Sequence, residues 1–362
     1  MPDMLVLKCS YHSLMLLIDL LLLYYVWRSR YTPPTRFFLL CCCGGFAAIF
    51  LALATNGIHG NLAVHGLAWH GSFFLCASAF LMYREKIDGK PRRWFPSLTL
   101  VFGCIVFGVA VDALLIEPTA LVVKETTIMT PKITKPITIV FASDFQADRV
   151  GHYERRTMNK IKEQNADLIL FGGDYTQARA GELEKVLLDW NQLLREIDLQ
   201  ASLGIYAVQG NFDRSGWEDM FEGTAIVPQE QTLTKTIGEI RVTFLSLEMS
   251  RPGITIPDAE QEGKFRIMVA HRPNYAMVAQ DADLLLAGHT HGGQVQIPFL
   301  GLPIVTASQD LPRSWATGMT TMSNGATLIV SHGTGLERGI APRIRFYCRP
   351  DFWVIRLVPD RI

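Results

Sequence analysis

Short apolar runs that each end in a polar cluster constrain the fold of this chain more than any other feature. The last of them, Leu284–Ala287, leads into Gly288-His289-Thr290-His291. An apolar run of this length is typical of a buried β-strand. Two imidazoles at positions i and i+2 after such a strand can point into one pocket at its carboxyl end. A single His-x-His pair occurs by chance, so the interpretation depends on what the other runs carry.

Four upstream segments have the same design. Their apolar runs are Ile139–Ala142, Leu168–Phe171, Ile205–Val208 and Phe265–Ala270. Each ends in carboxylate, amide or imidazole groups, which are the ligand types that a two-metal hydrolytic site requires. In chain order, the polar residues at the five strand ends are Asp144, Gln146, Asp174, Asn211, Asp213, His271, His289 and His291.

Composition narrows the class of protein. A length of 362 residues suggests about two domains. Lysine plus arginine balance aspartate plus glutamate at 34 each, so no basic field points to nucleic acid as a partner. Six of the seven cysteines lie in the first 118 residues, so the rest of the chain, with Cys348 alone, cannot form an internal disulfide. Cysteine usage therefore does not decide the compartment.

Four apolar stretches open the chain, and each approaches the length of about 20 residues that crosses a bilayer. They are Tyr11–Trp27, Phe37–Thr55, Leu62–Tyr83 and Leu98–Leu115. A cleaved signal peptide would explain one such stretch but not four. The sequence therefore predicts a transmembrane helical domain at 1–118, followed by a second domain at 119–362.

Basic residues in the short loops predict the orientation. The loop at 56–61 has no lysine or arginine, and Lys8 opposes the trend weakly. The two basic loops carry Arg28, Arg30 and Arg36, and Arg84, Lys86, Lys90, Arg92 and Arg93. If both loops are cytoplasmic, the second domain lies on the extracytoplasmic face of a multi-pass membrane protein.

Ionisable residues also occur inside the predicted spans, at Asp19, His65, His70 and Asp112. Such groups are costly in a membrane and often functional. The alternative is a polar contact between helices or a position near the water interface, and we favour that interpretation because the sequence shows no partner geometry.

The second domain begins as alternating strands and helices and continues mostly as strands. Helices are expected at Tyr153–Gln164 and at Glu182–Ile197, where apolar residues recur at helical spacing. After Trp217 the pattern changes to period two, at Gln231–Thr236 and Ile240–Leu247. This order indicates an α/β sandwich with mixed sheets.

The strand-end motifs resemble those of the calcineurin-like metallophosphoesterase family, which has D-x-H, G-D, G-N-H-D, H and G-H-x-H in this order. The likeness runs from about Lys135 to Val358. Ile116-Glu117-Pro118 and Gly292-Gly293-Gln294-Val295 resemble the family's membrane-associated branch, in which transmembrane helices precede the phosphoesterase domain. The likeness implies a β-sandwich flanked by helices. The matching motifs here are Asp144-x-Gln146, Gly173-Asp174, Gly210-Asn211-x-Asp213, His271 and Gly288-His289-x-His291.

The resemblance also implies two divalent metal ions, Mn²⁺ first, with Fe or Zn²⁺ as alternatives. It assigns the first ion to Asp144, Gln146, Asp174 and His291. Asp174 would bridge to the second ion, completed by Asn211, His271 and His289. Such ions polarise a phosphoryl oxygen and acidify a water that attacks phosphorus.

Two residues depart from the family pattern. Gln146 stands where the family has a histidine ligand, and an amide oxygen is a weaker donor that favours Mn²⁺ or Mg²⁺. Phe212 replaces the histidine that helps to protonate the leaving oxygen, a contribution of typically about 10²–10⁴-fold. Arg214, Arg272 and His332 are candidates for the missing positive charge. We expect Asn211, Asp213, Arg214 and His332 to act in catalysis.

The function expected from these features is a membrane-anchored, metal-dependent phosphohydrolase that cleaves a phosphoester or pyrophosphate bond of a membrane-associated, phosphorylated substrate. One alternative is an enzyme like the relatives that cleave UDP-2,3-diacylglucosamine in lipid A synthesis, which need a cytoplasmic active site. A second alternative, motivated by Gln146 and Phe212, is a catalytically weakened protein that binds metal or phosphate. A transporter or channel regulated by the second domain is disfavoured, because four spans with only two acidic residues inside offer few polar groups for a transport pathway.

Overall fold

The computed structural model describes residues 4–29, 31–55, 59–87, 90–91, 93–179, 181–251, 263–278, 282–300, 302–303, 311–338 and 342–360. It divides into two compact units. The helical unit comprises Met1–Ile116 and Arg338–Arg343, and the sandwich unit comprises Glu117–Glu337 and Ile344–Ile362.

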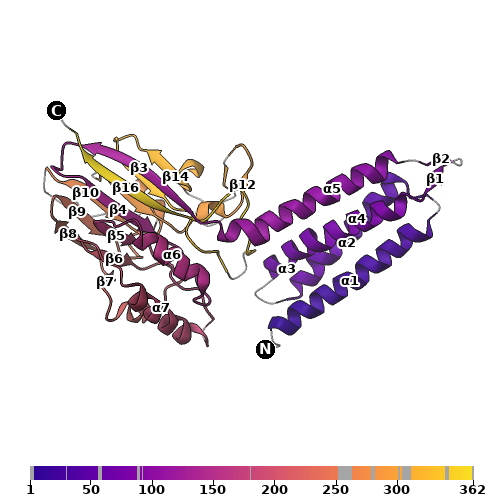
Figure 1. The fold of residues 1–362 in the computed structure, drawn as a ribbon, viewed down its shortest axis with the longest axis horizontal. Coiled ribbons are helices and arrows are strands. Elements are labelled where there is room, and N and C mark those ends of the chain that lie inside the picture. The colour runs from indigo at the N-terminus through magenta and orange to yellow at the C-terminus, as the bar shows by residue number, and fades with distance from the viewer. Residues whose placement is uncertain are drawn as a thin grey trace. The chain divides into compact units, whose positions relative to one another are not determined.

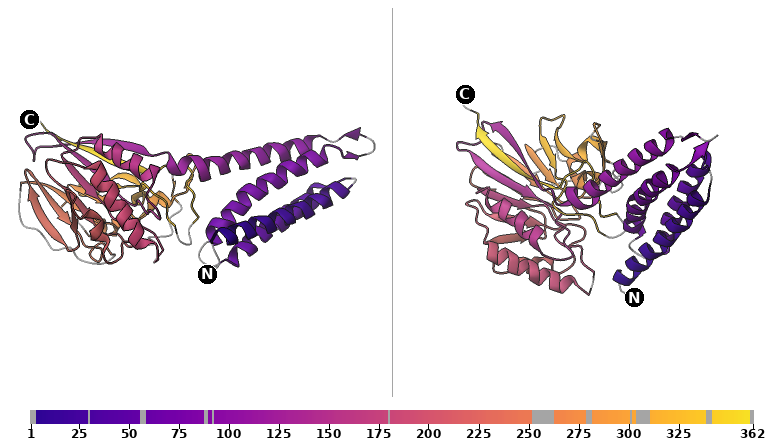
Figure 2. Two further views of the ribbon diagram at one scale, coloured as in Figure 1. Left: turned by 60° about the horizontal axis from the view of Figure 1, so that its bottom comes forward. Right: turned by 45° about the vertical axis from the view of Figure 1, so that its right-hand side comes forward.

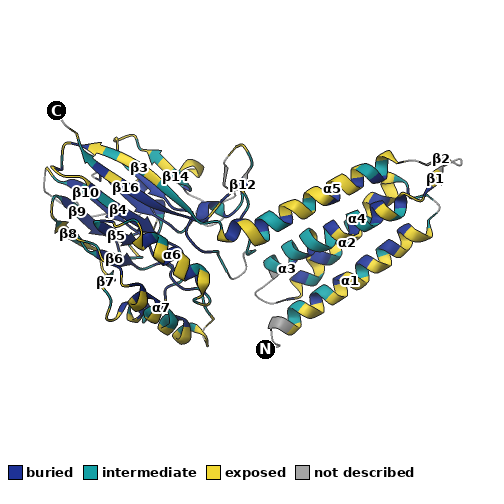
Figure 3. Ribbon diagram, viewed as in Figure 1, coloured by how far each residue is buried: buried dark blue, intermediate teal, exposed yellow. Residues whose placement is uncertain are grey.

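The helical unit contains four helices that are long and apolar enough to cross a membrane. Figure 1 shows them lying lengthwise beside one another, and Figure 3 shows exposed residues along their outer sides. Phe46, Phe50 and Phe80 are among the exposed large apolar residues of these helices. The first helix, Met4–Arg28, is longer than the apolar stretch Tyr11–Trp27 that the sequence pattern predicted. The elements are α1 (Met4–Arg28), α2 (Pro34–Leu53), α3 (His59–His65), a π-helical turn (Gly66–His70), α4 (Gly71–Met82), the hairpin β1 (Lys86–Ile87) and β2 (Lys90–Pro91), α5 (Trp94–Val111) and a second π-helical turn (Asp112–Ile116).

A polar contact inside this unit joins α1 to the first π-helical turn. Asp19 Oδ2 lies 2.7 Å from His70 Nδ1, and His70 Nε2 lies 3.1 Å from His12 Nδ1. The Asp19 side chain is buried. A buried ionisable group among apolar helices is stabilised by such a partner, so Asp19 and His70 make the interhelical polar contact that the sequence interpretation favoured.

The sandwich unit is built on two six-stranded sheets. The first has the order β3 (Val122–Thr130), β16 (Asp351–Pro359), β4 (Ile137–Ala142), β5 (Leu168–Phe171), β6 (Ile205–Val208) and β7 (Ile226–Gln229). The second has the order β14 (Gly318–Thr321), β15 (Thr327–Val330), β11 (Leu284–Ala287), β10 (Phe265–Val269), β9 (Ile240–Phe244) and β8 (Leu233–Ile237). A short sheet pairs β12 (Gln296–Ile297) with β13 (Leu302–Pro303).

Side-chain alternation explains how the layers pack. In β4, Ile139 and Phe141 join the core between the two sheets, while Val140 and Ala142 face the helices on the outer side. Because successive side chains of a strand point to opposite faces, a strand buried on both faces is apolar throughout. The helices are α6 (His152–Lys162) and α7 (Leu183–Ile197), close to their predicted ranges, and Figures 1 and 2 show them covering the outer face of the first sheet. The predicted α/β sandwich with mixed sheets is confirmed.

Parallel pairing gives the sandwich a common functional edge. Strands β4, β5 and β6 run parallel in the first sheet, and β9, β10, β11 and β15 run parallel in the second. The carboxyl ends of parallel strands meet at one edge of a sheet, where ligands commonly bind. The polar residues that follow these strands are therefore brought together.

Candidate metal centre

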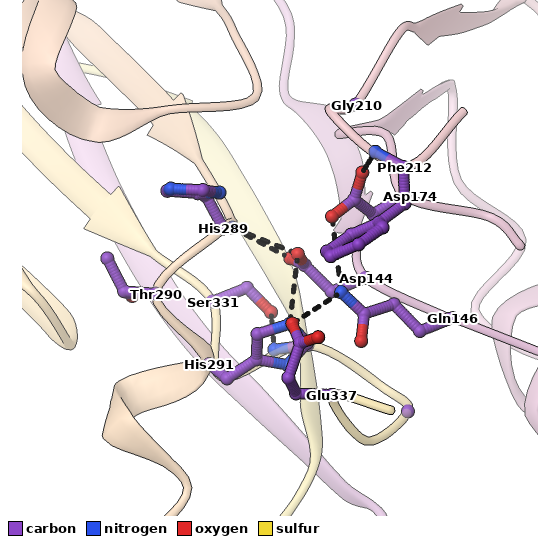
Figure 4. A network of polar contacts seen from close by, with 12 residues as sticks. Asp144, Gln146, Asp174, Gly210, Phe212, His289, Thr290, His291, Ser331 and Glu337 are labelled. Carbon is purple, nitrogen blue, oxygen red and sulfur yellow. Dashed lines mark hydrogen bonds and ion pairs between the residues drawn. The ribbon is translucent and has the colours of Figure 1, made fainter. Parts of the chain in front are cut away.

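The loops after five strands place the predicted ligands in one cluster, and Figure 4 shows five of them, Asp144, Gln146, Asp174, His289 and His291. Asp144 and Gln146 follow β4, Asp174 follows β5, Asn211 follows β6, His271 follows β10, and His289 and His291 follow β11. Backbone hydrogen bonds tie the loops to one another, since Asp144 N donates to Gly173 O at 2.9 Å and Gln146 N donates to Asp174 O at 2.8 Å. Asp144, Gln146, Asp174 and His271 are buried.

His271 lies at the centre of the group expected to hold the second ion. Its Nδ1 is 2.8 Å from the carbonyl oxygen of Gly172, which only accepts, so Nδ1 carries the proton. Its Nε2 is 2.9 Å from Asn211 Oδ1, 3.3 Å from Asp174 Oδ2 and 3.2 Å from His289 Nδ1. Ligand atoms of Asp174, His271 and His289 all lie within 4.8 Å of one another. Oxygen and nitrogen atoms whose lone pairs face one another repel unless a positive charge, either a proton or a metal cation, lies between them.

The group expected to hold the first ion lies beside it. His291 Nε2 is 3.5 Å from Asp144 Oδ1, and Gln146 Nε2 donates to Asp174 Oδ2 at 3.2 Å. Three buried atoms here have no hydrogen-bond partner within the described ranges. They are the two ring nitrogens of His291 and the Oε1 of Gln146. Buried polar atoms are rarely left without a partner. These residues therefore fit a divalent cation that their lone pairs would meet.

Backbone conformation marks the same residues. A left-handed φ is uncommon outside glycine and tends to occur at functional sites, where the surrounding structure holds the strain. Ten described residues other than glycine have it, and five of them are predicted metal ligands. The five are Asp144 (54°), Gln146 (43°), Asp174 (57°), His289 (69°) and His291 (51°).

Glycines permit the close approach of these loops. A Cβ atom on Gly288 would lie 2.1 Å from Asp144 Oδ2, and one on Gly210 would lie 2.2 Å from Asp174 Oδ1. No larger residue fits at these two positions, so the motifs need glycine there for steric reasons.

Asp213 joins two of the strand-end loops. Its carboxylate accepts hydrogen bonds from the backbone N–H groups of Asp174 (2.7 Å), Gly210 (2.8 Å) and Tyr175 (2.8 Å). These contacts favour a positioning role, in which Asp213 fixes the backbone that presents Asp174. Its predicted catalytic role stays a prediction.

The candidates for the missing positive charge differ in placement. Arg214 is exposed. His332 is buried, with Nδ1 donating to the carbonyl of Arg349 at 3.0 Å and Nε2 accepting from the hydroxyl of Thr317 at 2.5 Å, so both ring nitrogens are engaged. Arg272 is half-buried and directly follows His271. Burial and Arg251 lower the pKa of Arg272, whereas the charge of Asp174 raises it, so Arg272 lies within the electrostatic reach of the cluster.

One acidic residue at the cluster has no place among the predicted ligands. Glu337 Oε2 lies 3.3 Å from Gln146 Nε2, on the loop after β15. The sequence carried a signal for this loop, because β15 is a further apolar run ending in a polar cluster, Ser331-His332. The match was missed because the first ionisable carboxylate comes seven residues after the strand.

Electrostatics lead to a prediction for stability. Burial raises the pKa of Asp144 to about 7, and burial with the charge of Asp174 raises the pKa of Asp213 to about 7. Burial alone would lower the pKa of His271, but Asp174 raises it to about 9. Burial would likewise raise the pKa of Asp174, but His271 lowers it to about 2.

With a chelator present, we expect the thermal midpoint to fall as the pH rises from about 6.5 to about 9. An ordinary aspartate titrates near pH ~4, so between about 4 and 7 the folded protein binds more protons through Asp144 and Asp213 than the unfolded chain does. His271 acts in the same sense between about 6.5 and 9, and a fold that binds more protons loses stability as the pH rises. Asp174 gives the opposite trend below about 4, and His291 and His332, whose pKa burial lowers, give it below about 6.5. Tryptophan fluorescence would follow melting, and saturating Mn²⁺ should remove the trend. A midpoint that rises over this range with chelator present would contradict the prediction.

Comparisons with known proteins agree with the geometry. The family model for calcineurin-like phosphoesterases matches residues 137–293. The uncharacterized metallophosphoesterase YkuE of Bacillus subtilis is 31% identical over 220 residues, covering 54% of this chain and 70% of that protein. The phosphodiesterase YaeI of Escherichia coli is 26% identical over 208 residues, covering 54% of this chain and 72% of that protein. A solved dimetal phosphatase from Danio rerio aligns at 11% identity and a TM-score of 0.35, over 55% of this chain and 88% of that one, a likeness too low to carry an argument.

Proposed function

This chain belongs to the calcineurin-like metallophosphoesterase family, whose members are metal-dependent phosphoester hydrolases, and we propose that it cleaves a phosphoester or pyrophosphate bond of a membrane-associated substrate. The observation that carries the proposal is the convergence of Asp174, Asn211, His271 and His289 from four separate strand ends, with their donor atoms facing one another. Side chains from distant parts of the chain meet this way when they bind a shared ligand.

The two ligand groups divide the work between two divalent cations. We assign the first to Asp144, Gln146, Asp174 and His291, and the second to Asp174, Asn211, His271 and His289. Bound cations of this kind polarise a phosphoryl oxygen and lower the pKa of water, which becomes the nucleophile. The first group offers three oxygen donors and one imidazole, a set that favours Mn²⁺ over Zn²⁺.

The other residues hold this arrangement in place. Gly172 O fixes the His271 ring with Nε2 facing the cluster, and the backbone N–H of Phe212 donates to Asp174 Oδ1 at 2.8 Å. The Phe212 ring has no proton to give to a leaving group. We assign part of the missing positive charge to Arg272, because it lies within the field of Asp174, whereas Arg214 is exposed.

The helical unit motivates the substrate class. Four helices long and apolar enough to cross a membrane would keep the hydrolase at a lipid surface, where a lipid phosphate or a lipid-linked pyrophosphate is the accessible substrate. The distribution of basic residues favours an extracytoplasmic active site. A pyrophosphatase acting on UDP-2,3-diacylglucosamine is the alternative, and it requires the opposite orientation.

Full-length protein in detergent should hydrolyse bis-p-nitrophenyl phosphate when Mn²⁺ is present and lose this activity with a chelator. His289→Ala removes a donor atom that lies 3.2 Å from His271 Nε2 and should lower turnover by about 10²-fold, which corresponds to roughly 3 kcal/mol. His152→Ala is the matched control, because His152 is exposed at the start of α6. Equal turnover in the wild-type and His289→Ala proteins would sink the proposal.

A further inference from the structure

A loop from the second sheet carries a carboxylate to the Gln146 side of the cluster. Glu337 Oε2 accepts a hydrogen bond from Gln146 Nε2 at 3.3 Å, and Glu337 Oε1 accepts one from Gln177 Nε2 at 2.6 Å. The Glu337 backbone N–H donates to Gln294 Oε1 at 2.9 Å. Figure 4 shows Glu337 and His291 on the same side of Gln146. The side chain is half-buried.

Close backbone contact fixes where this loop runs. Gly335 N donates to Asp144 O at 2.7 Å, and Thr334 N donates to Ser143 O at 3.0 Å. A Cβ atom on Gly335 would lie 1.9 Å from Phe145 O, so only glycine allows this approach. Since Glu337 lies two residues later, the loop holds its backbone against the segment that bears Gln146.

The buried guanidinium of Arg345 holds this loop in place by hydrogen bonds to its carbonyl oxygens. Arg345 is completely buried, and its Nη2 donates to the carbonyl oxygens of Gly335 at 2.6 Å and His332 at 2.7 Å. The Tyr153 hydroxyl donates to the carbonyl oxygen of Thr334 at 2.5 Å. Glu337 therefore extends from a backbone held by several hydrogen bonds, unlike an exposed loop residue.

The two carboxylates beside Gln146 form a negatively charged site that a cation would stabilise. The Gln146 amide nitrogen lies between two carboxylates, since it donates to Asp174 Oδ2 at 3.2 Å as well as to Glu337 Oε2. The Gln146 Oε1 is buried and, in the part of the chain that the structure describes, has no hydrogen-bond partner. Turning the carboxamide by a half-rotation exchanges its oxygen and nitrogen. Three oxygen donors would then face one point, and a divalent cation is what such a point binds.

We propose that Glu337 is an additional carboxylate ligand of the first cation, supplying the donor strength that Gln146 lacks relative to the family's histidine. This inference rests on the proposed function, because it concerns the same metal site. The resulting ligand group is Asp144, Gln146, Asp174, Glu337 and His291, with one nitrogen among oxygens. Such a group selects Mn²⁺ or Mg²⁺ over Zn²⁺.

Binding of Mn²⁺ alone tests the inference without reference to activity. Isothermal titration of full-length protein should show two classes of Mn²⁺ site, and Glu337→Gln should weaken one class by about 10–100-fold while leaving the other within about threefold. Glu163→Gln is the matched control, because Glu163 is exposed at the end of α6. Unchanged melting of Glu337→Gln in a chelator would show that the variant is folded.

A second variant removes the remaining ambiguity. In a Gln146→His background, the imidazole restores a strong donor, so Glu337→Gln should cost less than about threefold in Mn²⁺ affinity. If the wild-type protein binds no Mn²⁺, the proposed function fails. If it binds Mn²⁺ at two sites and Glu337→Gln binds it equally well, the proposed function stands and the role of Glu337 is refuted.

Discussion

Asp174→Asn is expected to lower Mn²⁺-dependent turnover of bis-p-nitrophenyl phosphate by about 10³-fold or more. Asp174 is the residue that the two proposed ligand groups share, with Oδ2 lying 3.3 Å from His271 Nε2 and 3.2 Å from Gln146 Nε2. The substitution keeps an oxygen for the backbone N–H of Phe212 but removes the charge that two cations would share. Loss of metal-based charge stabilisation amounts to several kcal/mol, or about a thousandfold in rate. Elemental analysis should also find fewer bound Mn²⁺ ions per chain.

Asp198→Asn is the matched control for this experiment. Asp198 is exposed at the end of α7 and has a left-handed φ of 51°, close to the 57° of Asp174. The same chemical change therefore meets the same backbone conformation in the two proteins, and Asp198→Asn should keep both turnover and metal content. If Asp174→Asn retained more than about a tenth of the wild-type turnover, a shared carboxylate ligand would be excluded.

The strand-end residues were predictable because they depend on local features. A short apolar run followed by Gly and Asp, Asn or His determines both a buried strand and a polar loop at its carboxyl end, and chain order alone supplies the parallel neighbours. Asp144, Asp174 and His271 follow β4, β5 and β10 as their sequence patterns indicate. Helix α7 was equally accessible, since its apolar residues recur at helical spacing.

Contacts between distant loops were not predictable in this way. Glu337 lies 191 residues from Gln146 in sequence. Its position depends on the close approach of Gly335 to Phe145 O and on the hydrogen bond from Arg345 to Gly335 O. No periodicity encodes such packing. The contacts of Asp213 with the backbone N–H groups of Asp174 and Tyr175, 39 and 38 residues away, likewise follow from packing between loops and not from a local pattern.

Phe212→His is expected to have the second large effect, which is an increase in the turnover of alkyl phosphodiesters. Phe212 directly follows Asn211, and its backbone N–H donates to Asp174 Oδ1, so a histidine there would bring an ionisable imidazole beside the cluster. General acid catalysis contributes about 10²–10⁴-fold when the leaving oxygen needs a proton. Phe212→His should therefore raise turnover of alkyl phosphodiesters by at least about 10²-fold. Turnover of bis-p-nitrophenyl phosphate should change little, because p-nitrophenolate leaves without a proton.

Phe212→Leu separates proton donation from the effect of a smaller side chain. Leucine also shortens the side chain but carries no proton to donate, so this variant should show no gain on alkyl esters.

The comparison of Phe212→His with the wild-type protein also decides between a working hydrolase and a weakened phosphate-binding protein. A gain confined to alkyl esters means that the cations and the nucleophile already function and that the site is adapted to good leaving groups, such as the phosphate of a pyrophosphate. If Phe212→His raised neither activity while Mn²⁺ bound normally, the weakened binder would be the better description. An equal gain on both substrates would instead show that access to the site had changed and would exclude proton donation as the cause.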